Sequence, residues 1–242
     1  MVNIIGLLLT KHGAHLRPET GEDSFWHTRG AEYARKLFAG VDRYTQQAHQ
    51  NFLITDSPEL APPGVTAVQT PLTRQAGPGW WGKLAIFHPD LFPDGEKTLY
   101  LDLDNVVCGP LDPILDLEPE PLMMLDDIHE PGLPNGSTLL YRPGECRWLW
   151  DEYIRFSAEI QDAFSVWPNA ADQAYIASRF QRRFAIAPTF MQNRLPAGMI
   201  LNARTDIERN ADYSGTSLVF GSWHPKPHES SQAFYRQHWI DE

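Results

Sequence analysis

The sequence predicts an α/β protein with a mainly parallel sheet that carries helices on both faces. Short apolar runs bounded by turn-forming residues recur along the chain, as expected for strands. Segments with apolar residues at helical spacing separate several of these runs. Because strands and helices alternate in the first half, their connections suit parallel strands joined by helical crossovers.

The apolar runs define the candidate strands. The first, residues 3–9, lacks a basic leader and is too short to span a membrane, so we interpret it as a buried strand. We therefore expect no transmembrane segment. The other runs are residues 51–55, 64–69, 97–103, 121–125, 137–142, 184–188 and 217–221.

Helical patterns lie between these strands. The longest, residues 144–162, places Trp148, Leu149 and Tyr153 near helical spacing. The other predicted helices are residues 29–40, 79–88, 170–182 and 231–239.

Composition favours one packed domain over residues 1–242. Hydrophobic residues make up 42% of the chain and charged residues 21%, which is not the profile of a disordered protein. The two cysteines, Cys108 and Cys146, lack metal-type or redox-type spacing, so we expect reduced thiols and a cytoplasmic location.

The net charge bears on possible partners. A formal charge of −11, with acidic residues spread along the chain, leaves no extended basic surface for duplex nucleic acid. A nucleotide can still bind where a few cations and a metal ion are focused in one cleft.

The most informative segment runs from Lys97 to Val107 and reads KTLYLDLDNVV. An apolar strand leads into Asp102 and Asp104, one residue apart. Ionised carboxylates resist burial, so their natural place is the carboxyl end of the strand, where open α/β sheets bind ligands. There they can converge on a hard divalent cation such as Mn²⁺ or Mg²⁺. The alternative is a pair of surface acids that ends a strand.

The flanking motifs resemble glycosyltransferase family 8, whose members have the Rossmann-like GT-A fold. The resemblance rests on residues 79–87 (GWWGKLAIF), on the segment with Asp102 and Asp104, and on residues 109–114 (GPLDPI). Downstream, residues 134–141 (PNGSTLLY) are similar to a Phe-Asn-Ser-Gly segment of the family, and Asp172-Gln173 to its Asp-Gln pair.

The C-terminal motif departs from the family pattern. Residues 220–228 (FGSWHPKPH) resemble a His-rich loop that ends in Lys-Pro-Trp, but Phe220 stands where the family has a metal-binding histidine, six residues before Lys226. We expect His224 to replace it as the third metal ligand. The alternatives are a cation held by the two aspartates, phosphates and water, and a site that binds the donor weakly.

The resemblance implies a donor site for a nucleotide diphosphate sugar. Asp102 and Asp104 would hold Mn²⁺ or Mg²⁺ against the diphosphate, and Asp102 would also contact the ribose. Lys83 would meet the donor's phosphates or the transferred sugar, and Lys226 would reach the β-phosphate. The base would lie against the exit of the first strand, at residues 9–12 with Thr10, and beside residues 55–56 at the exit of the second predicted strand. The alternative for each lysine is a solvated surface side chain.

The resemblance also places residues around the transferred sugar. One of Asp126 and Asp127, of which we select Asp127, would lie there with Asn135, Asp172 and Gln173. Asp172 has a competing interpretation as an acid in the first turn of a helix, near the positive end of the helix dipole.

The predicted function is metal-dependent transfer of a hexose from a nucleotide diphosphate sugar, UDP-hexose above all, with retention of configuration. The acceptor is a glycan, protein or small molecule. One alternative is a haloacid-dehalogenase-type phosphatase with Asp102 as nucleophile, although that motif normally ends the first strand. A second is a non-catalytic nucleotide-sugar binding protein, and a sugar nucleotidylyltransferase ranks last because no Gly-rich phosphate loop follows the first strand.

Overall fold

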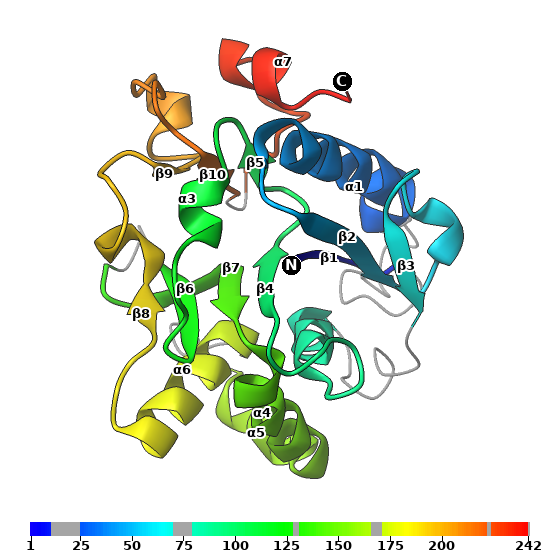
Figure 1. The fold of residues 1–242 in the computed structure, drawn as a ribbon, viewed down its shortest axis with the longest axis vertical. Coiled ribbons are helices and arrows are strands. Elements are labelled where there is room, and N and C mark those ends of the chain that lie inside the picture. Colours follow the sequence, from blue (N-terminus) through cyan, green and yellow to red (C-terminus); the bar gives the residue numbers. More distant parts are fainter. Residues whose placement is uncertain (11–24, 70–78, 128–130, 166–170, 222–223, 242) are drawn as a thin grey trace.

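The computed structural model describes residues 1–10, 25–69, 79–127, 131–165, 171–221 and 224–241. Its centre is a seven-stranded sheet in the order β3-β2-β1-β4-β7-β6-β8 (Figure 1). The four strands β1 to β4 are mutually parallel, and β7 runs antiparallel to both of its neighbours. The expected α/β fold with a mainly parallel sheet is confirmed. The strands are β1 (Val2–Leu8), β2 (His49–Thr55), β3 (Thr66–Gln69), β4 (Lys97–Leu101), β6 (Leu122–Asp126), β7 (Pro134–Tyr141) and β8 (Thr189–Phe190).

A three-stranded sheet lies beside the large one. Its order is β5 (Val106–Val107), β10 (Leu218–Phe220) and β9 (Ile200–Asn202), with β10 antiparallel to β5 and parallel to β9. β5 follows β4 after a short turn, so this small sheet ties the C-terminal part of the chain to the end of β4 (Figure 1).

Helices cover both faces of the large sheet. α1 (Phe25–Tyr44) and α7 (Ala233–His238) lie on the side of the small sheet (Figure 1). α4 (Pro143–Arg155), α5 (Ser157–Ala163) and α6 (Ala171–Phe184) lie on the other side, together with the 3₁₀ segment η2 (Gly79–Phe87). The remaining short elements are α3 (Asp112–Leu115), η1 (Pro58–Leu60), η3 (Met191–Asn193) and η4 (Ile207–Arg209).

Alternate residues of the central strands enter the two cores, as the two-residue period of a strand requires. Ile4 of β1 packs on the α1 side, whereas Ile5 packs on the side of η2 and α4. In β4, Leu99 and Leu101 face α1, and Tyr100 faces the opposite core. Both faces are therefore buried, which explains why the central strands read as continuous apolar runs.

Two predicted elements are wrong in detail. The run 184–188 is not a strand: Phe184 ends α6, Ala185 has a positive φ of 57°, and Ile186 is exposed. The backbone thus ends the helix with a left-handed residue, and the strand β8 starts later. The predicted helix 144–162 is two helices, because the backbone leaves the helical region at Phe156 (φ −131°, ψ 34°). The second helix then turns Ile160 into the core.

Two other segments differ in type or extent. The predicted helix 79–88 is the 3₁₀ segment η2, and the predicted strand 97–103 stops at Leu101. β5 and β9 have two and three residues, too few to give a periodic pattern, and the sequence did not predict them.

Glycine at position 109 is required where the small sheet meets the end of β5. A Cβ at Gly109 would lie 2.3 Å from the carbonyl oxygen of Thr216, which belongs to the backbone and cannot rotate away. We expect Gly109→Ala to lower the free energy of unfolding by about 1–3 kcal/mol, measured by urea denaturation. Gly95→Ala is the matched control, because its Cβ would meet nothing within 4 Å. Equal stability of the two variants would contradict this packing.

Candidate active site

The candidate site begins where β4 ends. Asp102 and Asp104 lie in a turn in which the Asn105 amide donates to the Asp102 carbonyl over 3.0 Å. The turn is fixed to the neighbouring strand, because the Asp102 amide donates to the Ser137 carbonyl of β7 over 2.8 Å. The two carboxylates therefore sit at the carboxyl end of a buried strand, as the sequence predicts.

Asn105 holds this turn in place. Its amide nitrogen donates to the Ser137 carbonyl and to Thr138 Oγ1, both over 2.9 Å, and its Oδ1 accepts from the Gly221 amide over 3.2 Å. The side chain is fully buried. Sequence reasoning missed this residue; the available signal was a polar amide directly after Asp-x-Asp in an otherwise apolar segment.

Lys83 joins three elements through its ammonium group. Its Nζ lies 3.2 Å from Asp102 Oδ1 and 3.3 Å from Asp172 Oδ2, and it donates to the Gly136 carbonyl over 3.0 Å. Lys83 comes from η2, Asp172 from the first turn of α6, and Gly136 from β7. The structure thus brings together Lys83, Asp102 and Asp172, three predicted site residues that lie far apart in the sequence.

Burial and charge pull in opposite directions on this cluster. Burial lowers the pKa of Lys83, but the carboxylates of Asp102 and Asp172 raise it more, so the net pKa lies above its ordinary value. Burial also raises the pKa of Asp102. The positive charge of Lys83 lowers this pKa and the negative charge of Asp104 raises it, so the net pKa lies above its ordinary value. Tyr100 donates a short hydrogen bond to the same carboxylate. Negative charge at Asp102 is therefore only partly balanced.

Asp104 has a separate cation. Its Oδ2 accepts a short hydrogen bond from Lys226 Nζ, and the carboxylate is largely buried. Gly221 backs onto it so closely that a Cβ there would lie 2.4 Å from Asp104 Oδ2. Burial lowers the pKa of Lys226, Asp104 raises it more, and the net shift is upward.

The turn that carries Lys226 is held by Glu229 and Tyr33. Glu229 Oε2 accepts from the Lys226 amide over 2.7 Å and lies 2.8 Å from His224 Nδ1. Tyr33 of α1 lies 2.6 Å from His228 Nδ1 through its hydroxyl. The turn is therefore held at the Lys226 amide by Glu229 and at the His228 side chain by Tyr33.

The structure does not place His224 with the aspartates. Its side chain is 69% exposed and faces Glu229. Among the residues that the structure describes, no group of three or more His, Cys, Asp or Glu side chains is arranged to hold a metal ion. The position expected to bear a histidine, Phe220, is buried in the core.

The residues expected around the sugar border the Lys83 cluster. Gln173 Oε1 accepts from the Gly136 amide over 3.2 Å. Asn135 donates to Asp127 Oδ2 over 3.3 Å, whereas the Asp126 carboxylate accepts from the Gly132 amide over 2.7 Å. Of the two adjacent aspartates, Asp127 is the one that contacts Asn135.

Thr10 belongs to another network at the ends of β1 and β2. Its amide and hydroxyl donate to Asp56 Oδ1 over 2.9 and 3.1 Å, and its hydroxyl lies 2.6 Å from Ser57 Oγ. Residues 11 and 12, expected beside the base, lie outside the described residues.

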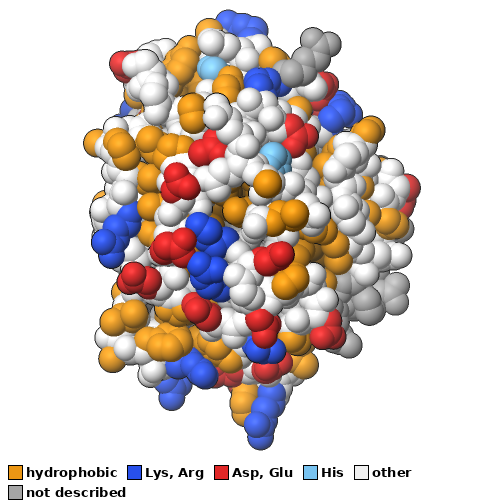
Figure 2. Space-filling model, in the orientation of Figure 1, with side chains coloured by type: hydrophobic (Ala, Val, Ile, Leu, Met, Phe, Trp, Pro, Cys, Tyr) orange, Lys and Arg blue, Asp and Glu red, His pale blue; other side chains and the backbone are white. Residues whose placement is uncertain are grey.

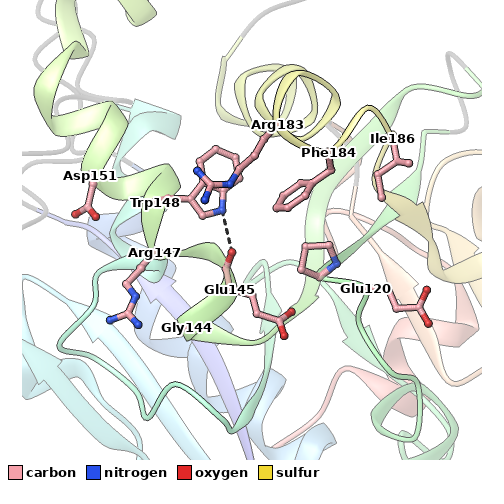
Figure 3. Close-up of a pocket in the computed structure, with 10 residues that line it drawn as sticks. Glu120, Gly144, Glu145, Arg147, Trp148, Asp151, Arg183, Phe184 and Ile186 are labelled. Carbon is pink, nitrogen blue, oxygen red and sulfur yellow. Dashed lines mark hydrogen bonds between the residues drawn. The ribbon is translucent and has the colours of Figure 1, made fainter.

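A separate cavity of about 750 Å³ lies at the other end of β6 and β7 (Figure 3). Its lining includes Pro121 before β6, Trp148 of α4 and Phe184 of α6, and Arg183 lies over the Trp148 ring at 4.7 Å. None of the predicted site residues lines it.

On the face shown in Figure 2, acidic and basic side chains are interspersed.

Comparisons with known proteins bear on the fold. No family model matches the chain, and no curated protein matches its sequence. Solved structures do match. The galactosyltransferase LgtC, described in complex with donor and acceptor sugar analogs, has a TM-score of 0.63 at 13% identity, with 97% of this chain and 93% of that chain covered.

Two further glycosyltransferases are similar. The bifunctional enzyme WbbM has a TM-score of 0.59 at 13% identity, over 98% of this chain and 48% of that one. GlyE from Streptococcus pneumoniae TIGR4 has a TM-score of 0.59 at 14% identity, over 98% and 59%. The chain therefore has the GT-A fold of these glycosyltransferases, as expected. None of the helices in the described part of the chain combines the length and apolar character needed to cross a bilayer.

Acidification tests the burial of the His228 imidazole. Burial, with a smaller effect from Arg29, lowers the pKa of His228 below 6.5. An unfolded chain therefore binds a proton at His228 before the folded chain does, so its stabilising contribution is present above pH 6.5 and is lost as pH falls below that value. We expect the free energy of unfolding to fall more steeply from pH 7.5 to 5.5 in the wild type than in His228→Gln, measured by urea denaturation. Parallel pH profiles of stability in the wild type and in His228→Gln would contradict a lowered pKa of His228 in the folded protein.

Proposed function

We propose that this protein is a glycosyltransferase that moves a hexose from a nucleotide diphosphate sugar, UDP-hexose above all, to a glycan, protein or small-molecule acceptor. One observation carries the proposal. Within a fold shared with glycosyltransferases, Asp102 and Asp104 directly follow a central strand. Lys83 bridges Asp102 and Asp172, and Lys226 pairs with Asp104. Polar groups are gathered at the sheet edge where α/β folds bind ligands.

A divalent cation fits this donor site. Asp102, Asp104 and Asp172 face the ammonium groups of Lys83 and Lys226, so one negative charge remains unbalanced. A diphosphate would add more negative charge, and carboxylate oxygens are the ligands that Mn²⁺ and Mg²⁺ prefer. We propose that Asp102 and Asp104 hold Mn²⁺ or Mg²⁺. When bound, such an ion supplies Lewis-acid stabilisation of the departing diphosphate.

His224 can complete this metal site only if its imidazole turns toward the aspartates; its contact with Glu229 is made through Nδ1 and does not occupy Nε2. Its exposed position in the Lys226 turn permits such a rotation, and phosphate and water are the alternative ligands. We keep His224 as a proposed third ligand on these grounds.

The protein's own residues then have distinct roles. Lys226 binds a phosphate oxygen, and its positive charge stabilises the leaving diphosphate. Lys83, which Asp102 and Asp172 hold in place, meets the donor's phosphates or the transferred sugar. Thr10 lies at the strand exit where the base would rest.

Asp127, Asn135, Asp172 and Gln173 border the space proposed for the hexose. Their carboxylate and amide groups suit hydrogen bonds to sugar hydroxyls. We propose transfer with retention, in which the leaving phosphate helps to deprotonate the acceptor. In a haloacid-dehalogenase-type phosphatase the Asp102 motif would end the first strand, whereas here Asp102 follows β4, the fourth strand along the chain.

Calorimetry with UDP and UDP-hexose tests the donor site. We expect binding that requires Mn²⁺ and weakens at least ~10-fold in Asp104→Asn, because an amide is a poorer ligand for a hard cation. Asp90→Asn is the matched control, since Asp90 is exposed and lies before β4. Failure of every nucleotide to bind with or without metal would contradict the proposal, and trapping of an aspartyl-phosphate at Asp102 would favour a phosphatase.

Substitution of Gln173 tests its role in catalysis apart from donor binding. Its side chain contacts the Gly136 amide rather than a phosphate-facing lysine. We expect Gln173→Ala to lower kcat by about 10- to 100-fold while the Kd for UDP changes less than about twofold. Steady-state kinetics and calorimetry measure the two quantities. An unchanged kcat would remove Gln173 from the reaction, and a non-catalytic binding protein would show donor binding with no turnover at all.

A further inference from the structure

The Lys226 ammonium group lies where it would compete with a cation for the Asp104 carboxylate. Its Nζ donates to Asp104 Oδ2, and Gly221 covers the same carboxylate from another direction. An ammonium group and a divalent ion bound to the same carboxylate repel each other at contact distance, so each weakens the binding of the other.

The other lysine is held more firmly. Lys83 keeps the Gly136 carbonyl and Asp172 as partners even if Asp102 turns to another cation. For Lys226 Nζ, the described residues provide one hydrogen bond, to Asp104. Of the two ammonium groups, Lys226 therefore has fewer hydrogen-bond partners among the described residues to retain it.

The geometry also lets this ammonium move without its loop. Glu229 fixes the Lys226 amide, and Tyr33 fixes His228, so the backbone of the turn stays anchored. The Lys226 side chain is 20% exposed and has a flexible four-carbon stem, so its ammonium group can rotate toward an incoming anion.

We infer that Lys226 and the divalent cation compete for Asp104, and that a diphosphate resolves the competition by drawing the lysine to itself. This inference rests on the proposed function. It makes cation and nucleotide binding strongly cooperative: the cation binds weakly alone, and UDP strengthens it by freeing Asp104. By linkage, the cation strengthens UDP binding by the same factor.

The test measures the affinity for Mn²⁺ from the electron paramagnetic resonance signal of the free ion. Wild type and Lys226→Met are compared with and without saturating UDP, at 0.05 and 0.5 M KCl. Without UDP, we expect Lys226→Met to bind Mn²⁺ at least ~10-fold tighter than wild type at both salt concentrations, because a contact competitor is removed and screening acts mainly on distant charges. UDP should strengthen Mn²⁺ binding by at least ~10-fold in wild type and by less in the variant.

Lys97→Met is the control. It removes the same charge at the opposite end of β4, where Lys97 pairs with Glu118, and we expect no change in Mn²⁺ affinity. Circular dichroism establishes that each variant is folded.

Three results would overturn the inference: Mn²⁺ affinity in Lys226→Met that equals or falls below that of wild type, a gain that disappears at 0.5 M KCl, or the same gain in Lys97→Met. Absence of Mn²⁺ binding in every protein would overturn it as well. UDP binding, measured beside these titrations, distinguishes failure of the inference from failure of the proposed function. If UDP binds but any of these results is found, only the inference is refuted. If UDP does not bind at all, the proposed function is refuted.

Discussion

The site depends on one electrostatic constraint: carboxylates at the end of a buried strand must be balanced by cations. Asp102 meets Lys83, and Asp104 meets Lys226. Each lysine comes from an element that has to be positioned for this contact, Lys83 from η2 against the sheet and Lys226 from a turn anchored on α1. With Asp172 included, the cluster keeps an excess negative charge. The same imbalance that limits its stability makes it suited to a divalent cation and an anionic ligand.

The surrounding backbone keeps the two carboxylates adjacent. Asn105 fastens their turn to β7 on one side and to Gly221 after β10 on the other. The small sheet thereby carries the C-terminal part of the chain, including Lys226, to the end of β4. A substitution at Gly221 would drive a side chain into the Asp104 carboxylate, so backbone packing and chemistry at this point are coupled.

The sequence predicted the parts of this arrangement that have a local pattern. The apolar run before Asp102 gave the strand and its exit, and the motifs gave Lys83, Asp172 and Gln173, which the structure brings to one place. Asn105 was missed because its role depends on hydrogen bonds to segments far along the chain. The run 184–188 has the composition of a strand because apolar residues at a helix end share it. The left-handed backbone of Ala185 instead ends α6 there. The direction of His224 depends on Glu229, a contact that no motif specifies.

Anomalous scattering from crystals grown with UDP and Mn²⁺ tests the central claim most directly. The account predicts a Mn²⁺ peak bonded to the carboxylates of Asp102 and Asp104 and to the diphosphate, with Lys226 Nζ moved from Asp104 to a phosphate oxygen. A Mn²⁺ ion or a nucleotide located elsewhere, with the Lys226–Asp104 pair intact, would contradict it.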